Sequence, residues 1–133
     1  GSTQNWNGIK LVFQKGASTD FPAASIIIGN KVYYTHWSPT KAHISHLQIS
    51  SSSAIDAEIR EAENALNSDC EIFIGGHGNV SNRECVIFKI NYLKTLKDLL
   101  SKDKKTFIET LKKIYPNLPG ETGLANLANS LYQ

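Results

Sequence analysis

The sequence predicts one small α/β domain, because strand-like segments gather in its first half and helical periodicity fills its second half. Two strand-like runs flank Gly29-Asn30, and apolar residues recur at helical spacing through most of 81–131. A chain of 133 residues has room for a single core. We therefore expect a short mixed sheet with a hairpin, followed by a helical C-terminal tail.

Two segments predict the strands of the first half. Residues 8–13 are mostly apolar and lie between Asn7-Gly8 and Gly16, which is typical of a strand bounded by turns. Residues 25–28 and 31–34 flank Gly29-Asn30, a two-residue connection that favours a tight β-hairpin. The hairpin is followed by an irregular segment that contains Pro39 and many hydroxyl residues.

The central stretch of the chain is Ile72-Phe-Ile-Gly-Gly-His77-Gly. Three apolar residues predict a short buried strand, and the glycines after them indicate a backbone that needs room. We expect His77 to lie on the loop that ends this strand. A helix should follow, since Ser81 and Glu84 have the spacing of a capping box.

Helical spacing predicts the remaining elements. Ser53 and Asp56 form a second possible capping box in front of a surface helix. Asp103 begins a third helix that ends before Pro116, and a short closing helix follows. The residues expected to face inward are Ile55, Ile59, Ala62, Leu66, Val86, Ile90, Leu93, Leu96, Leu100, Phe107, Ile108, Leu111, Ile114, Tyr115, Leu124, Leu127, Ala128 and Leu131.

The composition excludes several classes of partner. With 14 basic and 12 acidic residues the formal charge is +2, which gives no electrostatic argument for nucleic acid or a membrane surface. No apolar run reaches membrane-spanning length, so we expect a cytoplasmic protein. Cys70 and Cys85 are expected to be reduced packing residues, although the sequence leaves their pairing open.

The segment around His77 resembles the last metal-binding motif of the metallo-β-lactamase-fold hydrolases. The likeness rests on Gly-Gly-His77-Gly, after an Ile/Phe strand and before a helix that carries Tyr92-Leu-Lys-Thr-Leu96. It covers about residues 8–100 and implies the C-terminal half of an αββα sandwich, whose two sheets hold metals at their seam. The family's signature H-x-H-x-D-H, which belongs to the first half, is absent here.

The same resemblance implies three metal ligands in this chain. His77 corresponds to the histidine of the family's motif. Asp20, in Thr-Asp20-Phe-Pro-Ala, is similar to a carboxylate ligand of the alkyl-sulfatase branch. The family's bridging Asp is replaced by Trp37, so either His36 substitutes for it or that ligand is lost. Zinc is the expected ion, because imidazole and carboxylate ligands suit it.

Two further histidines suggest a substrate pocket. His43 and His46 are three residues apart and would share one face of a local helix, where they could bind an anionic group with Lys41 nearby. The alternative is that both are packed loop histidines. No residue is assigned a catalytic role, and none is assigned to an organic cofactor.

These observations leave three hypotheses for function. The first is a metal-dependent hydrolase of a small-molecule ester, thioester, lactam or sulfate ester, of which 3–133 are the C-terminal portion and Gly1-Ser2 a tag remnant. On that hypothesis the fragment alone is inactive. The second is a metal-free interaction or dimerisation module derived from the same fold. In either case we expect a homo-oligomer that covers the missing half. The third is an independent α/β domain whose histidine loop is coincidental.

Overall fold

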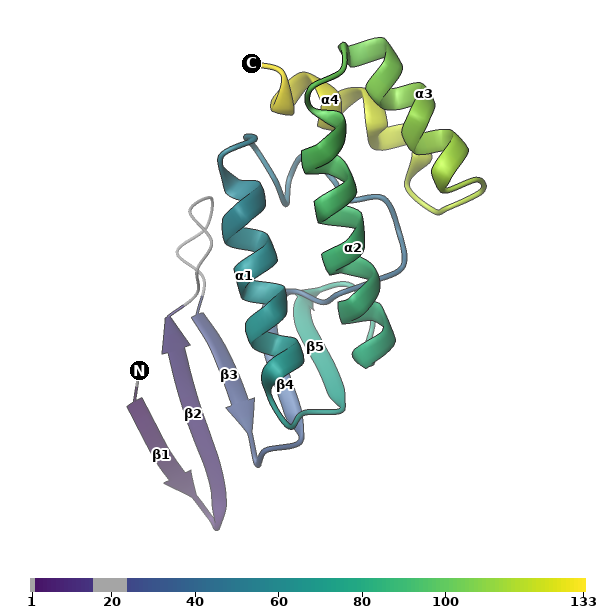
Figure 1. Cartoon of the computed structure of the whole chain (residues 1–133). Helices are drawn as coiled ribbons and strands as arrows, with labels where there is room; N and C mark the ends of the chain where they lie inside the picture. Colours follow the sequence, from purple (N-terminus) through teal and green to yellow (C-terminus); the bar gives the residue numbers. More distant parts are fainter. Residues whose placement is uncertain (1, 16–23) are drawn as a thin grey trace.

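The structure is a computed structural model that describes residues 2–15 and 24–133, and it has two parts (Figure 1). One part is a sheet with two helices packed on one side, and the other is a helical C-terminal end that lies beyond the sheet. The strands are β1 (Ser2–Trp6), β2 (Ile9–Lys15), β3 (Ala24–Ile28), β4 (Val32–Trp37) and β5 (Ile72–His77). The helices are α1 (Ala54–Asn67), α2 (Arg83–Leu99), α3 (Lys104–Ile114), the 3-10 turn η1 (Glu121–Gly123) and α4 (Leu124–Leu131).

The five strands form one mixed sheet in the order β1-β2-β3-β4-β5. The first four are antiparallel neighbours, whereas β5 pairs parallel with β4 after the chain has crossed over through α1. A parallel pair needs such a crossover, because its strands run in the same direction. The structure therefore confirms the predicted α/β class, the mixed sheet with a hairpin and the helical C-terminal end.

Strand β1 was not predicted from the sequence. Its residues are polar up to Trp6 and all of them are exposed, so they show no alternation. The usable signal was the pair Asn7-Gly8, whose positive φ values of 52° and 84° form the two-residue turn between Trp6 and Ile9. Asn-Gly is the dipeptide most favoured in such a hairpin turn.

The predicted hairpin around Gly29-Asn30 is present, with a longer connection than expected. Ile28 pairs with Val32, so three residues join β3 to β4 instead of two. The backbone N–H of Lys31 donates to the carbonyl of Ile28 at 3.1 Å and closes the turn.

Both predicted capping boxes are wrong, for different reasons. Ser53 has helical dihedral angles and its side chain makes no capping hydrogen bond, whereas a cap needs an extended residue. Ser81 exchanges two backbone hydrogen bonds with Phe73, which holds it in the sheet. Asn82 caps α2 instead, since its side chain accepts the backbone N–H of Cys85 at 3.1 Å.

Helix α3 begins as predicted. The side chain of Asp103 accepts the backbone N–H of Thr106 at 2.8 Å. Phe107 and Leu111 are fully buried, but Ile114 is 49% exposed and does not face inward. It lies in the last turn of the helix, where the packing surface ends.

The buried apolar residues form two clusters. The sheet-side cluster joins the sheet to α1 and α2 and contains Tyr33, Ala62, Ala65, Cys70, Phe73, Val86 and Ile90. The helical cluster contains Ile44, Ile49, Ala54, Ile55, Ile59, Tyr92, Leu93, Leu96, Phe107, Leu111, Leu124, Leu127, Ala128 and Leu131. Helices α1 and α2 contribute to both clusters and so connect the two parts of the fold.

The opposite side of the sheet is apolar and belongs to neither cluster. Paired residues of neighbouring strands carry their side chains on the same side of the sheet. On the side opposite the helices, no described strand residue has a buried side chain. We call this surface the open sheet face. Its apolar members are Trp6, Ile9, Leu11, Phe13, Ile26, Ile28, Val32, Tyr34, Ile72 and Ile74.

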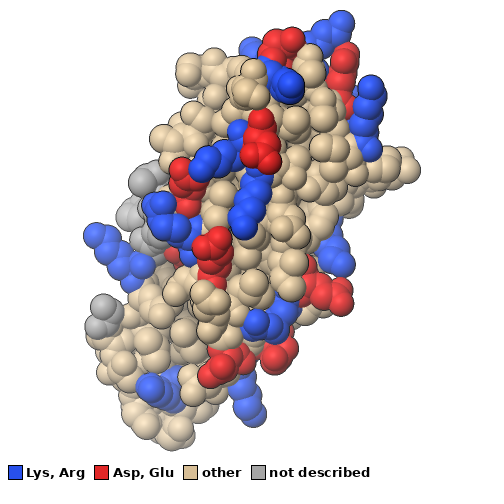
Figure 2. Space-filling model, viewed as in Figure 1, with Lys and Arg blue, Asp and Glu red and all other residues tan. Residues whose placement is uncertain are grey.

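The helical side of the molecule has a different surface. Figure 2 shows Lys and Arg side chains interspersed with Asp and Glu over this side. Several form ion pairs, such as Lys97 with Asp56 at 2.8 Å. Within residues 2–15 and 24–133, no helix has the length and apolar character needed to cross a membrane.

Candidate functional site at the ends of β4 and β5

The last residues of two neighbouring strands bring three aromatic side chains together. Strand β5 continues through the glycine pair, so His77 is its final residue and not a loop residue as expected. The register pairs His77 with Trp37, the final residue of β4. His36 precedes Trp37 and lies beside the same pair. We call His36, Trp37 and His77 the strand-end cluster.

Gly75 allows the end of β5 to lie close to the end of β4. A Cβ atom at Gly75 would lie 2.5 Å from the backbone nitrogen of Ser38 and 2.8 Å from the carbonyl oxygen of Thr35. Real Cβ contacts are not that short, and both partners belong to the backbone. The sequence-based expectation that the backbone needs room here is therefore confirmed.

The three rings of the cluster are in contact. The imidazole centroids of His36 and His77 are 4.9 Å apart, with their planes inclined by 74°. The indole of Trp37 stacks on His77, with a centroid distance of 4.4 Å and an angle of 26° between planes. The His77 side chain is exposed, so one side of this arrangement is open to solvent.

The cluster supplies two nitrogen-bearing rings that could ligate a metal. A catalytic zinc needs about three protein ligands. Within the described part of the chain, no three His, Cys, Asp or Glu side chains come close enough together to hold an ion. Asp20, the third predicted ligand, lies outside the described residues. The predicted set is thus brought together for His36 and His77, and it stays a prediction for Asp20.

Trp37 lies on the side of the cluster that faces the helices. Its indole Nε1 is buried without a hydrogen-bond partner among the described residues. The ring lines a cavity of about 20 Å³ between the sheet and the helices, together with Tyr33, Phe73 and Val86. A cavity of that size has room for about one water molecule.

His43 packs against Tyr92 of helix α2 and is not part of the strand-end cluster. It is 7% exposed, and its Nδ1 lies 2.7 Å from the Tyr92 hydroxyl in a buried hydrogen bond. Burial lowers the pKa of His43 from 6.5, and the Glu121 carboxylate opposes that shift. Its Nε2 is buried and has no partner among the described residues. His43 also lines a second cavity of about 20 Å³, together with Ser38 and Gln48.

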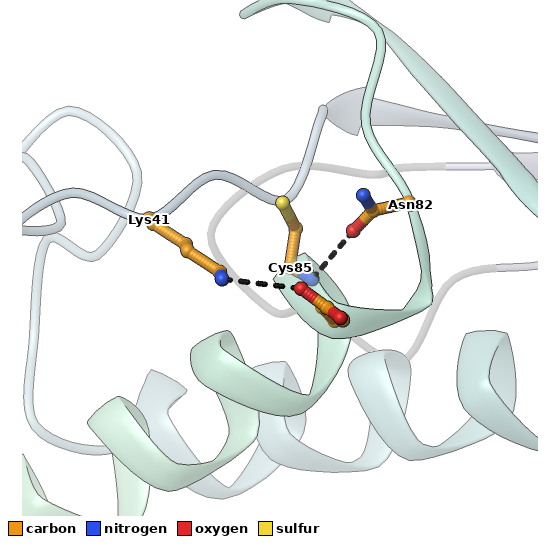
Figure 3. Close-up of polar contacts among 4 residues, drawn as sticks. Lys41, Asn82 and Cys85 are labelled. Carbon is orange, nitrogen blue, oxygen red and sulfur yellow. Dashed lines mark hydrogen bonds and ion pairs between the residues drawn. The ribbon is translucent and has the colours of Figure 1, made fainter.

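The other two predicted substrate-binding residues do not share that cavity. His46 is half-buried in a turn, and the segment that holds His43 and His46 is not helical. Lys41 is exposed and pairs with Glu84 at 3.4 Å. In Figure 3, Lys41 reaches toward the first turn of α2, where the Asn82 side chain meets the backbone of Cys85.

The thiol groups of the two cysteines take no part in the contacts drawn in Figure 3. Cys70 and Cys85 are both free thiols; Cys70 is buried in the sheet-side cluster and Cys85 is half-buried. In Figure 3 neither dashed line ends on the Cys85 sulfur. Cys70 therefore has the predicted role in packing, and for Cys85 that role stays a prediction.

Sequence reasoning missed two partners of the predicted site. The Trp37–His77 stack follows from the parallel register of β4 with β5, which pairs the two residues and which the sequence does not fix. The pairing of Tyr92 with His43 had no local signal, because the two residues come from segments far apart in the sequence.

No known protein family, curated protein or solved structure matches this chain. The resemblance to metallo-β-lactamase-fold hydrolases therefore rests on the residues and the order of elements alone.

Proposed function

We propose that this chain is a metal-free interaction module, related to one half of the metallo-β-lactamase fold, that associates through its open sheet face. The observation that carries this proposal is the face itself, on which ten apolar side chains spread across five strands and none of them is buried by the rest of the described chain. Monomeric proteins rarely leave so large an apolar surface in contact with water.

The strand-end cluster supports the metal-free part of the proposal. Trp37 occupies the position where the related hydrolases carry a bridging Asp, and an indole ring cannot ligate zinc. The ring stacks on His77 at 4.4 Å and covers one face of the only imidazole that the family motif identifies. A zinc ion held by two imidazoles alone would lack the third ligand that catalytic sites use.

Zinc titration of the purified chain tests this proposal. We expect no stoichiometric zinc binding by isothermal titration calorimetry. Trp37→Asp should gain binding, because it adds a carboxylate beside the two histidines, and Trp37→Phe serves as the control that adds none. Tight binding of one zinc by the unaltered chain, lost in His77→Ala, would contradict the metal-free proposal.

A second candidate function is the metal-dependent hydrolase itself. The observation in its favour is the 4.9 Å separation of the His36 and His77 rings at the ends of adjacent strands. On this proposal Asp20 or residues from outside the chain complete the site, and a zinc-bound hydroxide attacks an ester, thioester, lactam or sulfate ester. Zinc-dependent hydrolysis that is lost in His77→Ala would favour it.

A further inference from the structure

The open sheet face is mostly apolar and partly exposed to solvent. Its three most exposed members are Trp6 at 71%, Ile9 at 50% and Ile72 at 45%, and its other apolar members are half-buried by their neighbours in the sheet. The register adds Ser2, Gln4 and Ala24 at its margin. Lys15, the last residue of β2, is its one charged member among the described strand residues.

We infer that this face docks a second copy of the chain, so that two sheets pack face to face. This inference rests on the proposed interaction function and names the partner. In a two-fold symmetric contact, each surface meets an identical surface. A charged patch would repel itself in that arrangement, whereas the centre of this face carries no charge. Charge repulsion therefore does not oppose a contact between two copies of this face.

The size of the face agrees with such a contact. Five strands spaced about 4.8 Å apart and five to seven residues long cover roughly 450 Å² per copy in projection. Two copies would together remove on the order of 1,000 Å² from water, which is about the lower bound for a specific interface. The dimer should therefore dissociate on dilution.

The side chains also suit sheet-on-sheet packing. Ile26, Ile28, Val32 and Ile74 are β-branched, and Phe13 and Tyr34 flank Ile26 on its neighbouring strands. Rows of such side chains interdigitate when two twisted sheets pack about 10 Å apart at an angle near 30°. The helices lie on the other side of the sheet and would stay exposed on both outer surfaces of the dimer (Figure 1).

Light scattering coupled to size-exclusion chromatography tests this inference. At high concentration we expect twice the mass of one chain, falling toward one chain on dilution. Ile72→Lys on the open sheet face should give a monomer, and Ile26→Lys at its centre should do the same. Ile87→Lys on α2 is the matched control: Ile87 is 46% exposed, as Ile72 is 45% exposed, but lies outside the face, so this variant should remain a dimer.

Two results would overturn the inference. One is the mass of a single chain at every concentration, and the other is a dimer that Ile87→Lys disrupts as strongly as Ile72→Lys. Circular dichroism of each variant shows whether it has folded, and Ile72→Lys keeps the test valid if Ile26→Lys has not. A monomer would leave the zinc result unchanged, and zinc binding would leave the mass unchanged. Failure of this inference can thus be told apart from failure of the metal-free proposal.

Discussion

The indole ring of Trp37 stacks on the imidazole of His77, with ring centroids 4.4 Å apart and planes inclined by 26°. The two residues pair in register at the ends of adjacent parallel strands. Their contact joins the end of the hairpin to the end of β5, so it should stabilise the strand ends as well as shape the site.

A double-mutant cycle measures this contact. Trp37→Ala, His77→Ala and the double variant should show a coupling energy of about 0.5–1.5 kcal/mol in urea unfolding, as aromatic pairs do beyond the area they bury. Trp37→Ala combined with Tyr132→Phe is the control, because Tyr132 packs on Phe107 at the other end of the molecule. Additive behaviour of the Trp37 and His77 variants would mean that the stack contributes nothing.

Gly75→Ala should strongly destabilise the fold. Its new methyl group would lie 2.5 Å from the backbone nitrogen of Ser38, and relief requires the strands to separate. We expect a loss of about 1–3 kcal/mol or more in the free energy of unfolding. Gly123→Ala is the matched control, since its Cβ would meet nothing within 4 Å. Equal stability of the two variants would show that β4 and β5 are not held this closely.

The capping residues of α1 and α2 should respond differently to truncation. Asn82→Ala removes the acceptor of the Cys85 N–H and should cost about 1 kcal/mol. Ser53→Ala should change stability by less than about 0.5 kcal/mol, because the Ser53 side chain caps nothing. Thermal or urea unfolding of both variants gives the comparison. A larger effect for Ser53 would restore the capping box that the sequence suggested.

Arg83 ties the start of α2 to the end of α1. Its guanidinium donates to the carbonyls of Leu66 at 2.6 Å and of Ser68 and Cys70 at 3.1 Å. Arg83→Ala should lose about 1.5–3 kcal/mol in urea unfolding, and Arg83→Lys should recover only part of it, because an ammonium cannot reproduce the planar fork. Lys94→Ala, which removes an exposed ion pair with a 4.0 Å separation, should lose less than about 1 kcal/mol.

His43 should make the fold less stable in mild acid. Burial lowers its pKa from 6.5, so the unfolded chain takes up the proton first as the pH falls. The stability contributed by neutral His43 is therefore complete above pH 6.5. It declines as the pH falls from 6.5 to the pKa that His43 has in the folded chain. Urea unfolding at pH 7.5 and pH 5 measures the loss.

The matched variant for this prediction is His43→Gln, which cannot titrate and should show a smaller difference between the two pH values. The carboxyls of Asp56 and Asp103 do not interfere with this comparison. Hydrogen bonds from Lys97 and Thr106 lower their pKa from 3.8, so the stability that these carboxylates contribute is lost only at a pH below that range. An equal loss with and without the His43 imidazole would assign the effect to other groups.

Local patterns predicted the elements that depend on local chemistry. The hairpin around Gly29-Asn30, strand β5 and the helices follow from turn residues and apolar periodicity. The features that failed depend on distant partners. Ser81 could not be recognised as part of the sheet without knowing that it pairs with Phe73, and β1 has no apolar alternation to reveal it.

The candidate site was also predictable only in its local features. The glycines around His77 indicated a close backbone approach, which the Gly75 contacts confirm. The proximity of His36 to His77 depends on the parallel pairing of β4 with β5, which no spacing in the sequence fixes. His43 is a second such case, since its buried hydrogen bond joins it to Tyr92, 49 residues further along the chain.

The parallel pairing of β4 with β5 also bears on how the chain folds. Strand β1 can join β2, and β3 can join β4, through short turns, and such hairpins form within microseconds. Strand β5 can add only after α1 has closed a long loop, which is entropically slower. The contact between Trp37 and His77 should therefore be among the last native interactions to form, and intermediates that precede it would leave the β4 edge of the sheet unpaired.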